Sequence, residues 1–317
     1  MPVTRLGVAG LGWLGESLIK DAVRADEFEV VAVQDVAPDR AHDIALRYGV
    51  SWSGEDYSAL LAQSSVDAVL ICTPNHLHAQ QAQHALAARK DVLVQKPLAL
   101  SASDARQTLG TAKTAGRLLF VDYTYRFLAT MASLREALRL AGAVREVRAA
   151  FHNIYGPGAD KAWFFNPSTA GGGALMDLGV HLLDTGLWLL EARAVALEAA
   201  HLSAEQPVEH AAQLTLRLDA VPFEVAVSWN APMPNTQIFL ELVTETGTLR
   251  WENVEGSFFH FRALRDGEVL LDRETTLRED TLRAFAAALA DPRREPGGDV
   301  DTRVYEVLDQ AYGRALA

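Results

Sequence analysis

The chain has 317 residues, of which 49% are hydrophobic and 22% charged, and its formal net charge is −12. This apolar fraction can fill a core, which excludes bulk disorder, and the length suggests two domains or one large domain. The acidic balance argues against nucleic acid as a partner, because phosphate binding needs basic surface, and a single cysteine excludes a disulfide framework and a thiolate zinc cluster.

Short β-branched runs alternate with helical patterns over the first third of the chain. We predict strands over residues 3–9, 29–34, 68–72, 92–94 and 118–121, separated by helices over residues 14–25, 38–48, 76–88 and 101–115. Strands that are apolar throughout, with amphipathic helices between them, form a parallel sheet covered on both faces. The pattern therefore predicts a doubly wound α/β domain over residues 1–122.

The remainder of the chain has a different pattern. We predict helices over residues 127–140, 174–190, 281–289 and 302–316, and strands over residues 144–155, 213–218, 223–229, 238–243 and 248–251. A loop rich in glycine, proline and asparagine spans residues 156–173. Successive strands with flanking helices predict an α+β domain over residues 123–317, built on a largely antiparallel open sheet.

The sequence Gly-Leu-Gly-Trp-Leu-Gly, from Gly10 to Gly15, follows the first strand and opens a helix. Its glycines allow a tight turn and close approach of the backbone to a pyrophosphate, which the helix N-terminus attracts. Asp35 closes the second strand 20 residues after Gly15, where a carboxylate accepts hydrogen bonds from the ribose hydroxyls of NAD and repels the 2′-phosphate of NADP. A glycine-rich turn with a solvated aspartate is the alternative.

Two further turns follow strands of the predicted parallel sheet, at the edge where such sheets bind ligands. The first contains Thr73, Pro74 and Asn75 and then His76 and His78, which are either loop and cap residues or metal ligands; we expect no metal site.

The second turn is Gln95-Lys96-Pro97, where a cis peptide bond is plausible. Beside a nicotinamide, Lys96 could bind a substrate hydroxyl and stabilise developing negative charge on its oxygen; a surface lysine in a turn is the alternative.

The sequence Gly-Gly-Gly-Ala-Leu-Met-Asp-Leu-Gly-Val-His-Leu-Leu-Asp starts at Gly171. On a helix, Asp177, His181 and Asp184 fall within about 60° of one another, so one face carries two carboxylates around an imidazole. Either carboxylate would raise the basicity of His181 and suit it to act as a general base. A structural Asp–His cluster and a metal site are the alternatives.

Taken together, these motifs resemble the Gfo/Idh/MocA oxidoreductase family over nearly the whole chain. The resemblance implies an N-terminal Rossmann domain and catalysis by Lys96, Asp177 and His181, in which His181 takes a proton from a substrate hydroxyl. The chain departs from the family pattern at one position, because it has Gln95 before Lys96 where family members commonly have glutamate. The candidate cofactor contacts are Gly10, Leu11, Gly12, Trp13, Leu14, Asp35, Thr73, Pro74, Asn75, His78, Gln95 and Lys96, and the candidate substrate contacts are Lys96, Arg126, Asn153, Trp163, Asp177 and His181.

The leading hypothesis is an NAD-dependent dehydrogenase, with NADP the less favoured cofactor, acting on a secondary alcohol of a sugar, cyclitol or related polyol. Redox-neutral NAD-assisted elimination or glycosidic cleavage is one alternative, and a non-catalytic NAD(H)-binding sensor is another. Retention of Lys96, Asp177 and His181 argues against the sensor.

We also predict the partners and the location of the protein. The resemblance implies a homo-oligomer, a dimer or tetramer, formed through the C-terminal sheet; Trp229, Phe239 and Trp251 either cover that interface or lie under helices. No apolar run approaches the ~20 residues that span a bilayer, and the first ten residues lead into a strand instead of a signal peptide. We therefore expect a cytoplasmic protein that does not bind membranes.

Overall fold

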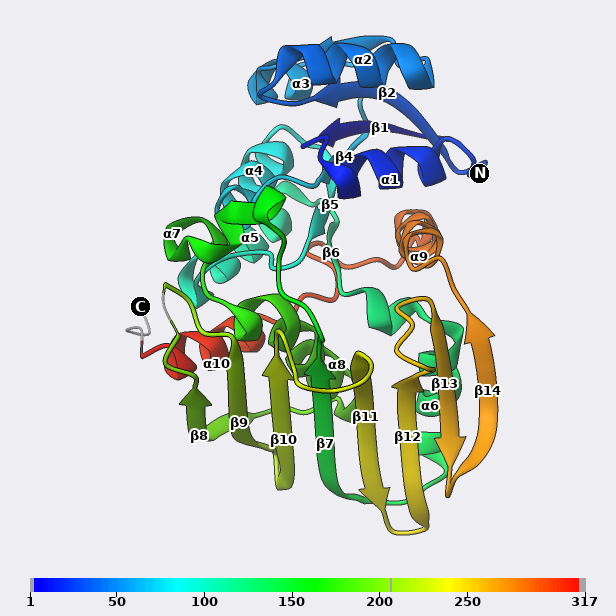
Figure 1. The fold of residues 1–317 in the computed structure, drawn as a ribbon. Coiled ribbons are helices and arrows are strands. Elements are labelled where there is room, and N and C mark those ends of the chain that lie inside the picture. The colour runs from blue at the N-terminus through cyan, green and yellow to red at the C-terminus, as the bar shows by residue number, and fades with distance from the viewer. Residues whose placement is uncertain (1–2, 206, 314–317) are drawn as a thin grey trace. The chain divides into compact units, whose positions relative to one another are not determined.

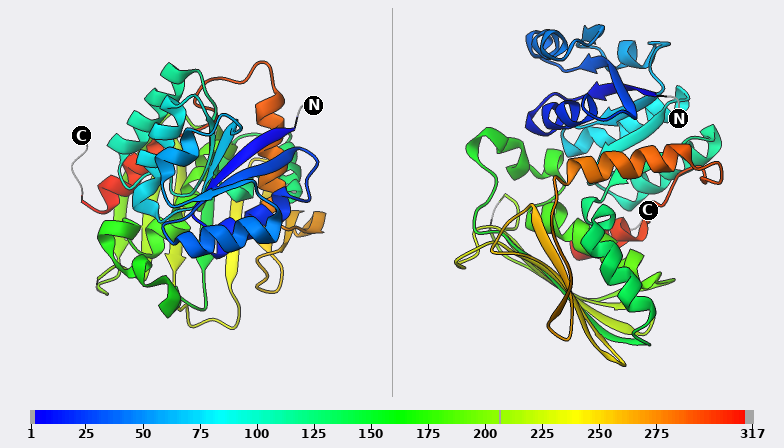
Figure 2. Two further views of the ribbon diagram at one scale, coloured as in Figure 1. Left: turned by 90° about the horizontal axis from the view of Figure 1, so that it is seen from above. Right: turned by 90° about the vertical axis from the view of Figure 1, so that its right-hand side faces the viewer.

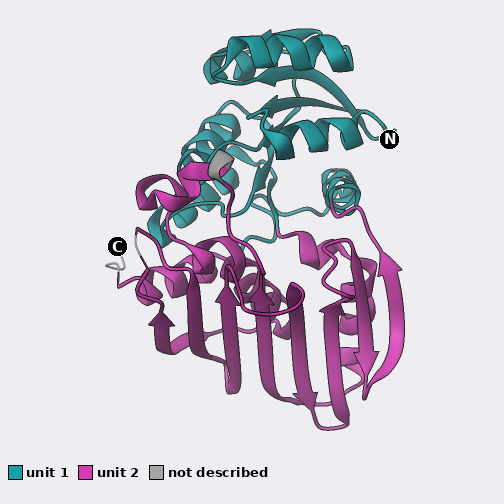
Figure 3. Ribbon diagram, viewed as in Figure 1, with its two compact units in different colours: residues 1–122, 278–300 teal, residues 123–277, 301–317 magenta. Residues whose placement is uncertain are grey.

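The structure is a computed structural model that describes residues 3–205 and 207–313, and the chain divides into two compact units (Figure 3). Unit 1 contains Met1–Asp122 and Arg278–Val300, and unit 2 contains Tyr123–Leu277 and Asp301–Ala317. The sequence-based division placed residues 278–300 with the second domain, whereas the structure groups them with the first.

Unit 1 is built on a parallel sheet with the strand order β3-β2-β1-β4-β5-β6 (Figure 1). Its strands are β1 (Thr4–Ala9), β2 (Phe28–Gln34), β3 (Trp52–Gly54), β4 (Ala68–Ile71), β5 (Asp91–Gln95) and β6 (Leu119–Asp122). They alternate with helices α1 (Trp13–Ala22), α2 (Pro38–Tyr48), α3 (Tyr57–Leu61), α4 (Asn75–Ala87) and α5 (Ala102–Ala115). The strand order reverses between β1 and β4, which confirms the doubly wound fold and places the turns after these strands at the switch point.

Helix α9 (Arg278–Ala290) joins unit 1 through its apolar face. The Phe285 ring is fully buried and lies 6.1 Å from the ring of Phe28 and 5.5 Å from that of Phe120. At the start of the helix, the Arg278 Nε donates to the Asp21 carboxylate at 2.8 Å. These contacts explain why a segment so late in the sequence belongs to the N-terminal unit.

Unit 2 is built on a mixed sheet with the strand order β14-β13-β12-β11-β7-β10-β9-β8. Its strands are β7 (Val144–His152), β8 (Val195–Leu202), β9 (Ala211–Leu218), β10 (Val221–Ser228), β11 (Gln237–Thr244), β12 (Gly247–Asn253), β13 (His260–Arg265) and β14 (Glu268–Glu274). Every neighbouring pair is antiparallel except β10 and β7. The predicted α+β domain with a largely antiparallel sheet is therefore confirmed.

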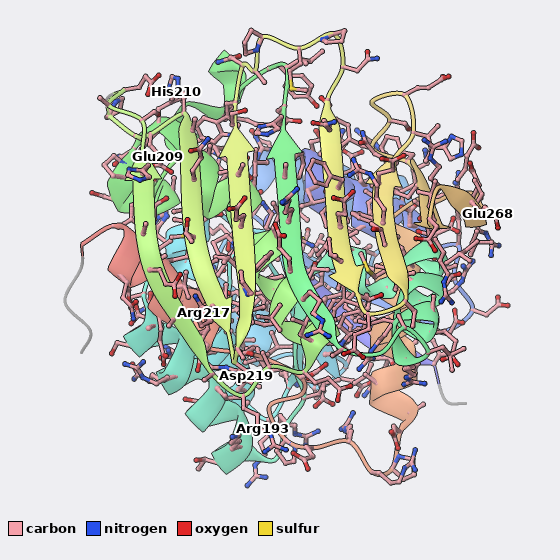
Figure 4. All side chains as sticks on the ribbon, turned by 90° about the horizontal axis from the view of Figure 1, so that it is seen from below. Arg193, Glu209, His210, Arg217, Asp219 and Glu268 are labelled. Atoms are coloured by element: carbon pink, nitrogen blue, oxygen red, sulfur yellow. The ribbon has the colours of Figure 1, made fainter. Side chains whose placement is uncertain are left out.

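The described part of unit 2 also contains helices. They are η1 (Thr124–Phe127), α6 (Ala129–Arg139), η2 (Ala159–Phe165), α7 (Pro167–Ala170), the π-helix η3 (Leu175–Gly179), α8 (Val180–Leu190) and α10 (Arg303–Ala311). Helices α6, α8 and α10 contact the strands from the same side (Figures 1 and 2). Figure 4 views the opposite face, where side chains such as Arg217 lie in front of the strands.

Several elements differ from the prediction. Strands β3, β8, β13 and β14 were not predicted, and the strand expected over residues 144–155 ends at His152. The last predicted helix, residues 302–316, ends at Ala311, and its positions 314–316 lie outside the described residues. Within the described part of the chain, no helix is long and apolar enough to cross a membrane.

Candidate functional site

The glycine-rich turn of unit 1 has the geometry that a dinucleotide needs. Gly10 adopts a φ of +84°, and a Cβ there would lie 2.7 Å from the backbone of Thr73, so the turn requires glycine. A Cβ on Gly15 would lie 2.0 Å from the Gly10 carbonyl oxygen, so this glycine allows α1 to pack closely on the strand. A Cβ on Gly12 would meet nothing within 4 Å, which leaves room for a pyrophosphate at the start of α1.

Asp35 stands at the end of β2 beside this turn, and its side chain is 6% exposed. Its carboxylate accepts hydrogen bonds from the backbone N–H groups of Leu11 at 2.8 Å and Ala37 at 2.9 Å. The Arg40 guanidinium lies 3.5 Å from the same carboxylate. These bonds fix the carboxylate at the edge of the turn, where it can also accept from a ribose hydroxyl.

The turn after β4 is connected to the turn after β5 by His78. The ring of this buried histidine has Nδ1 2.7 Å from the Pro97 carbonyl oxygen and Nε2 2.6 Å from the Thr73 carbonyl oxygen. Burial and the nearby charge of Lys96 lower the pKa of His78. Because both ring nitrogens face the protein's own backbone, we reassign His78 from a cofactor contact to a residue that joins the two turns.

Lys96 is the one half-exposed residue in the otherwise buried segment from Asp91 to Ala99. The Lys96–Pro97 peptide bond is cis, as predicted. The amide of the preceding residue, Gln95, is buried and donates to the Asp122 carboxylate at 2.7 Å. A glutamate at this position would face that carboxylate with a like charge, so the glutamine fits its surroundings here.

On the catalytic helix predicted for unit 2, the two candidate residues are the ones that reach the surface. Between Gly171 and Leu187, every residue is buried except Asp177 and His181, which are half-exposed. Asp177 lies in the π-helical turn η3, and His181 lies in the first turn of α8. Single π-helical turns within α-helices are frequent at functional sites.

Aromatic side chains surround these two residues. The indole Nε1 of Trp229 donates to the Asp177 carboxylate at 3.1 Å, and the ring of Tyr125 lies 5.0 Å from that of His181. Burial and the charge of Asp177 raise the pKa of the Tyr155 hydroxyl, although the residue as a whole is 53% exposed. The site thus presents a carboxylate, an imidazole and exposed aromatic surface together.

Asp184 does not join this group, although helical spacing placed it on the same face. Its side chain is fully buried and accepts from the Arg126 guanidinium through two hydrogen bonds, one of them 2.6 Å from Nε to Oδ2. The π-helical turn changes the angular relation between Asp177 and the residues that follow. Arg126, a candidate substrate contact, is committed to this buried ion pair, so we assign it a structural role.

The two other candidate substrate contacts lie in different surroundings. Asn153 is buried after β7, where its Oδ1 accepts from the Thr236 hydroxyl at 3.4 Å. Trp163 is half-buried in η2, and its ring lies 4.1 Å from that of Phe164. These interactions within the protein do not indicate that Asn153 or Trp163 binds a substrate.

Sequence reasoning missed the contact between Trp229 and Asp177, because the two residues are 52 positions apart and no local pattern joins them. Trp229 and Trp251 are buried within unit 2, whereas Phe239 is half-exposed beneath the Arg250 guanidinium. Burial therefore explains both tryptophans.

Comparisons with known proteins identify both parts of the chain. Residues 4–123 match the model of an oxidoreductase family with an NAD-binding Rossmann fold, and residues 132–250 match that of the GFO/IDH/MocA C-terminal domain. The structure resembles that of GenD2 from gentamicin A biosynthesis in complex with NAD, with a TM-score of 0.83, 26% identity, and coverage of 99% of this chain and 94% of that one.

Curated relatives share about a third of their aligned residues with this chain. The 1,5-anhydro-D-fructose reductase of Ensifer adhaerens is 32% identical over 62% of this chain and 60% of its own length. The D-glucoside 3-dehydrogenase of Escherichia coli (strain K12) is 31% identical over 59% of this chain and 56% of its own length. The chain thus spans somewhat more than half the length of these relatives.

Proposed function

The chain belongs to the GFO/IDH/MocA oxidoreductase family, and we propose that it transfers a hydride between a secondary alcohol of a sugar, cyclitol or related polyol and NAD. The observation that carries this proposal is the exposure of Asp177 and His181 on an otherwise buried helix. Both side chains reach the exposed face of this helix, where a carboxylate and an imidazole can meet a substrate.

The turn from Gly10 to Leu14 would hold the pyrophosphate of NAD, and the turn after β4, with Thr73, Pro74 and Asn75, would line the cofactor at the same sheet edge. Asp35 would bind the adenosine ribose, and its charge favours NAD over NADP. When bound, the nicotinamide supplies the hydride acceptor or donor.

His181 would act as the acid–base group in this reaction. It takes the hydroxyl proton of the alcohol during oxidation and returns it during reduction. Asp177 binds the substrate and orients His181, and the Trp229 indole holds the Asp177 carboxylate in place. Lys96 would bind a substrate hydroxyl and stabilise the negative charge that develops on its oxygen, the role that the family resemblance implies.

The aromatic surface near Asp177 supports a ring-shaped substrate. A sugar or cyclitol has apolar C–H faces and a polar rim, which suit an exposed ring such as that of Tyr155 beside charged groups. The relatives named as 1,5-anhydro-D-fructose reductase and D-glucoside 3-dehydrogenase point to the same substrate class.

We also propose that the protein forms a homo-oligomer through the helix-free face of the unit 2 sheet. That face carries Arg250, which pairs with both Glu241 and Glu252, above the half-exposed ring of Phe239. Light scattering coupled to size-exclusion chromatography measures the mass; a monomer at micromolar concentration would overturn this proposal. A cytoplasmic location stays a prediction.

The test of the proposed function follows absorbance at 340 nm with NAD⁺ and a panel of inositols, aldoses, sugar acids and amino-sugars. Lys96→Ala and His181→Ala should each lower kcat by about 10²-fold or more. Matched controls are Lys113→Ala and His84→Ala, which remove an exposed lysine and an exposed histidine from α5 and α4. Near-wild-type turnover in either site variant would refute the assignment.

A flat absorbance trace together with tight NADH binding would favour the alternatives. Redox-neutral NAD-assisted chemistry converts a substrate with no net change in absorbance, and product analysis by mass spectrometry would detect it. A sensor would bind NADH and convert nothing on the panel.

A further inference from the structure

The helix that carries Asp177 and His181 begins with an unusually complete set of hydrogen bonds. The first N–H groups of a helix have no partner within the helix. Here the N–H groups of Gly173 and Leu175 donate to the Glu209 carboxylate, each at 3.0 Å, and that of Ala174 donates to the Glu209 carbonyl oxygen at 3.0 Å. The N–H of Met176 donates to the Tyr312 hydroxyl at 3.1 Å.

Glu209 and Tyr312 are themselves connected. The Tyr312 hydroxyl donates to the Glu209 carboxylate at 2.8 Å while it accepts from Met176. Glu209 is 6% exposed, so its negative charge is held in a buried position by N–H groups at the positive end of the helix. Two residues from distant parts of unit 2 therefore hold four successive N–H groups at the start of the catalytic helix.

Two glycines before the helix, Gly172 and Gly173, allow Tyr312 and Glu209 to approach its backbone closely. A Cβ on Gly173 would lie 1.8 Å from the Glu209 carbonyl oxygen, and a Cβ on Gly172 would lie 2.1 Å from the Tyr312 hydroxyl. A side chain at Gly173 would collide with the Glu209 backbone, and one at Gly172 would displace the Tyr312 ring. The close approach of Glu209 and Tyr312 thus explains why the chain has glycine at both positions.

The segment that contains Glu209 also holds the other partner of Asp177. The His210 carbonyl oxygen accepts from the Trp229 backbone N–H at 2.7 Å, and the two rings lie 5.8 Å apart. Trp229 in turn donates to the Asp177 carboxylate. Figure 4 shows Glu209 and His210 together at the end of the sheet where the chain enters β9. Asp177 is therefore fixed through its helix by Glu209 and through its side chain by Trp229.

We propose that Glu209 and Tyr312 are positioning residues for catalysis, which set the π-helical turn of the catalytic helix so that Asp177 and His181 present their side chains to the substrate. This inference rests on the proposed function, because it assigns the two residues a role in that reaction. Neither residue is assigned contact with substrate or cofactor; they act through the helix.

The first experiment measures the helix without any substrate. Tyr312→Phe removes only the hydroxyl, which leaves the Met176 N–H without its acceptor. Hydrogen exchange of the peptide spanning residues 173–181 should become roughly ten-fold faster, while exchange in β7 and β10 stays unchanged. The matched control is Tyr57→Phe in unit 1, whose hydroxyl donates to the Gln81 carbonyl oxygen at 2.9 Å. Unchanged exchange in Tyr312→Phe would overturn the proposal.

The second experiment measures turnover on the substrate identified with the wild-type enzyme. Tyr312→Phe should lower kcat by roughly ten-fold or more with an unchanged Kd for NADH, because small displacements of catalytic groups slow chemistry strongly. Glu209→Gln keeps one acceptor oxygen and should retain more activity than Glu209→Ala. The double variant Glu209→Gln/Tyr312→Phe should lose less than the sum of the single losses, since both residues hold the same turn.

The outcomes separate this proposal from the proposed function. Faster exchange with wild-type kcat would show that the two residues stabilise the helix without positioning the reaction, which overturns the proposal and leaves the dehydrogenase intact. If His181→Ala retains full turnover, the proposed function fails, and the positioning role fails with it. If Glu209→Ala does not fold, Tyr312→Phe and Glu209→Gln still decide the question.

Discussion

Arg126 and Asp184 provide the sharpest test of how unit 2 is held together. Their side chains are 6% and 0% exposed, and the guanidinium also lies 5.4 Å from the ring centre of Tyr123. Arg126→Met keeps most of the volume but leaves the Asp184 carboxylate buried without its cation. Breaking one partner of a buried pair costs about 3–5 kcal/mol in the free energy of unfolding.

That cost is large enough to measure directly. At about 2–4 °C per kcal/mol for a domain of this size, the unfolding transition of unit 2 should fall by roughly 6–20 °C. Calorimetry and urea titration give the two values independently. The matched control is Arg135→Met, whose partner Glu191 is 72% exposed; an exposed pair of this kind contributes about 0–1 kcal/mol.

A double variant separates the ion pair from the packing around it. Arg126→Met/Asp184→Leu removes both charges and should recover most of the stability lost in the single variant, because apolar replacements of buried pairs are often neutral. If Arg126→Met instead unfolds like the wild type and raises KM for the substrate, Arg126 is a substrate contact and the structural assignment is wrong.

Two further predictions concern unit 1. Asp35→Ala should weaken NAD binding and raise the ratio of kcat/KM for NADP to that for NAD by about ten-fold or more, since it removes a ribose acceptor and a negative charge; an unchanged ratio would remove Asp35 from the ribose site. Burial lowers the pKa of His78, so the folded state favours its neutral ring. The resulting stability is fully present above pH 6.5 and is lost as the pH falls below that value. The urea midpoint should therefore drop between pH 7.5 and pH 5, and it should drop less in His78→Gln; equal slopes would contradict this account.

The sequence predicted the fold best where each strand carries its own signal. The central strands of unit 1 are mostly apolar, and β4 is apolar throughout, with every residue buried. The edge strand β14 has the opposite character, because all its residues except Leu271 are exposed and no apolar alternation marks it. The apolar face of α9 showed that the helix packs on something, but local pattern does not say that its partners are Phe28 and Phe120.

In the candidate site, too, local sequence patterns predicted some residues correctly and missed contacts between distant ones. Asp177 and His181 could be selected from the sequence because a carboxylate and an imidazole four positions apart stand out in an apolar helical segment, and both are half-exposed in the structure. The prediction that Asp184 lies beside His181 was wrong because Asp184 pairs with Arg126, 58 positions earlier. A buried ion pair with a distant residue leaves no pattern in the local sequence. The π-helical turn is equally hidden, since it depends on what the helix packs against.

Gly172 and Gly173, before the helix of Asp177 and His181, show where this limit lies. A run of glycines indicates that something approaches the backbone closely, and in a predicted enzyme a ligand is the natural candidate. In the structure the approaching groups are Glu209 and Tyr312, which are 36 and 136 positions from their partners Gly173 and Met176. The motif identifies the need for close contact, whereas only the fold identifies the partner. In this chain, Gly172 and Gly173 therefore mark the closely held start of the helix that carries Asp177 and His181.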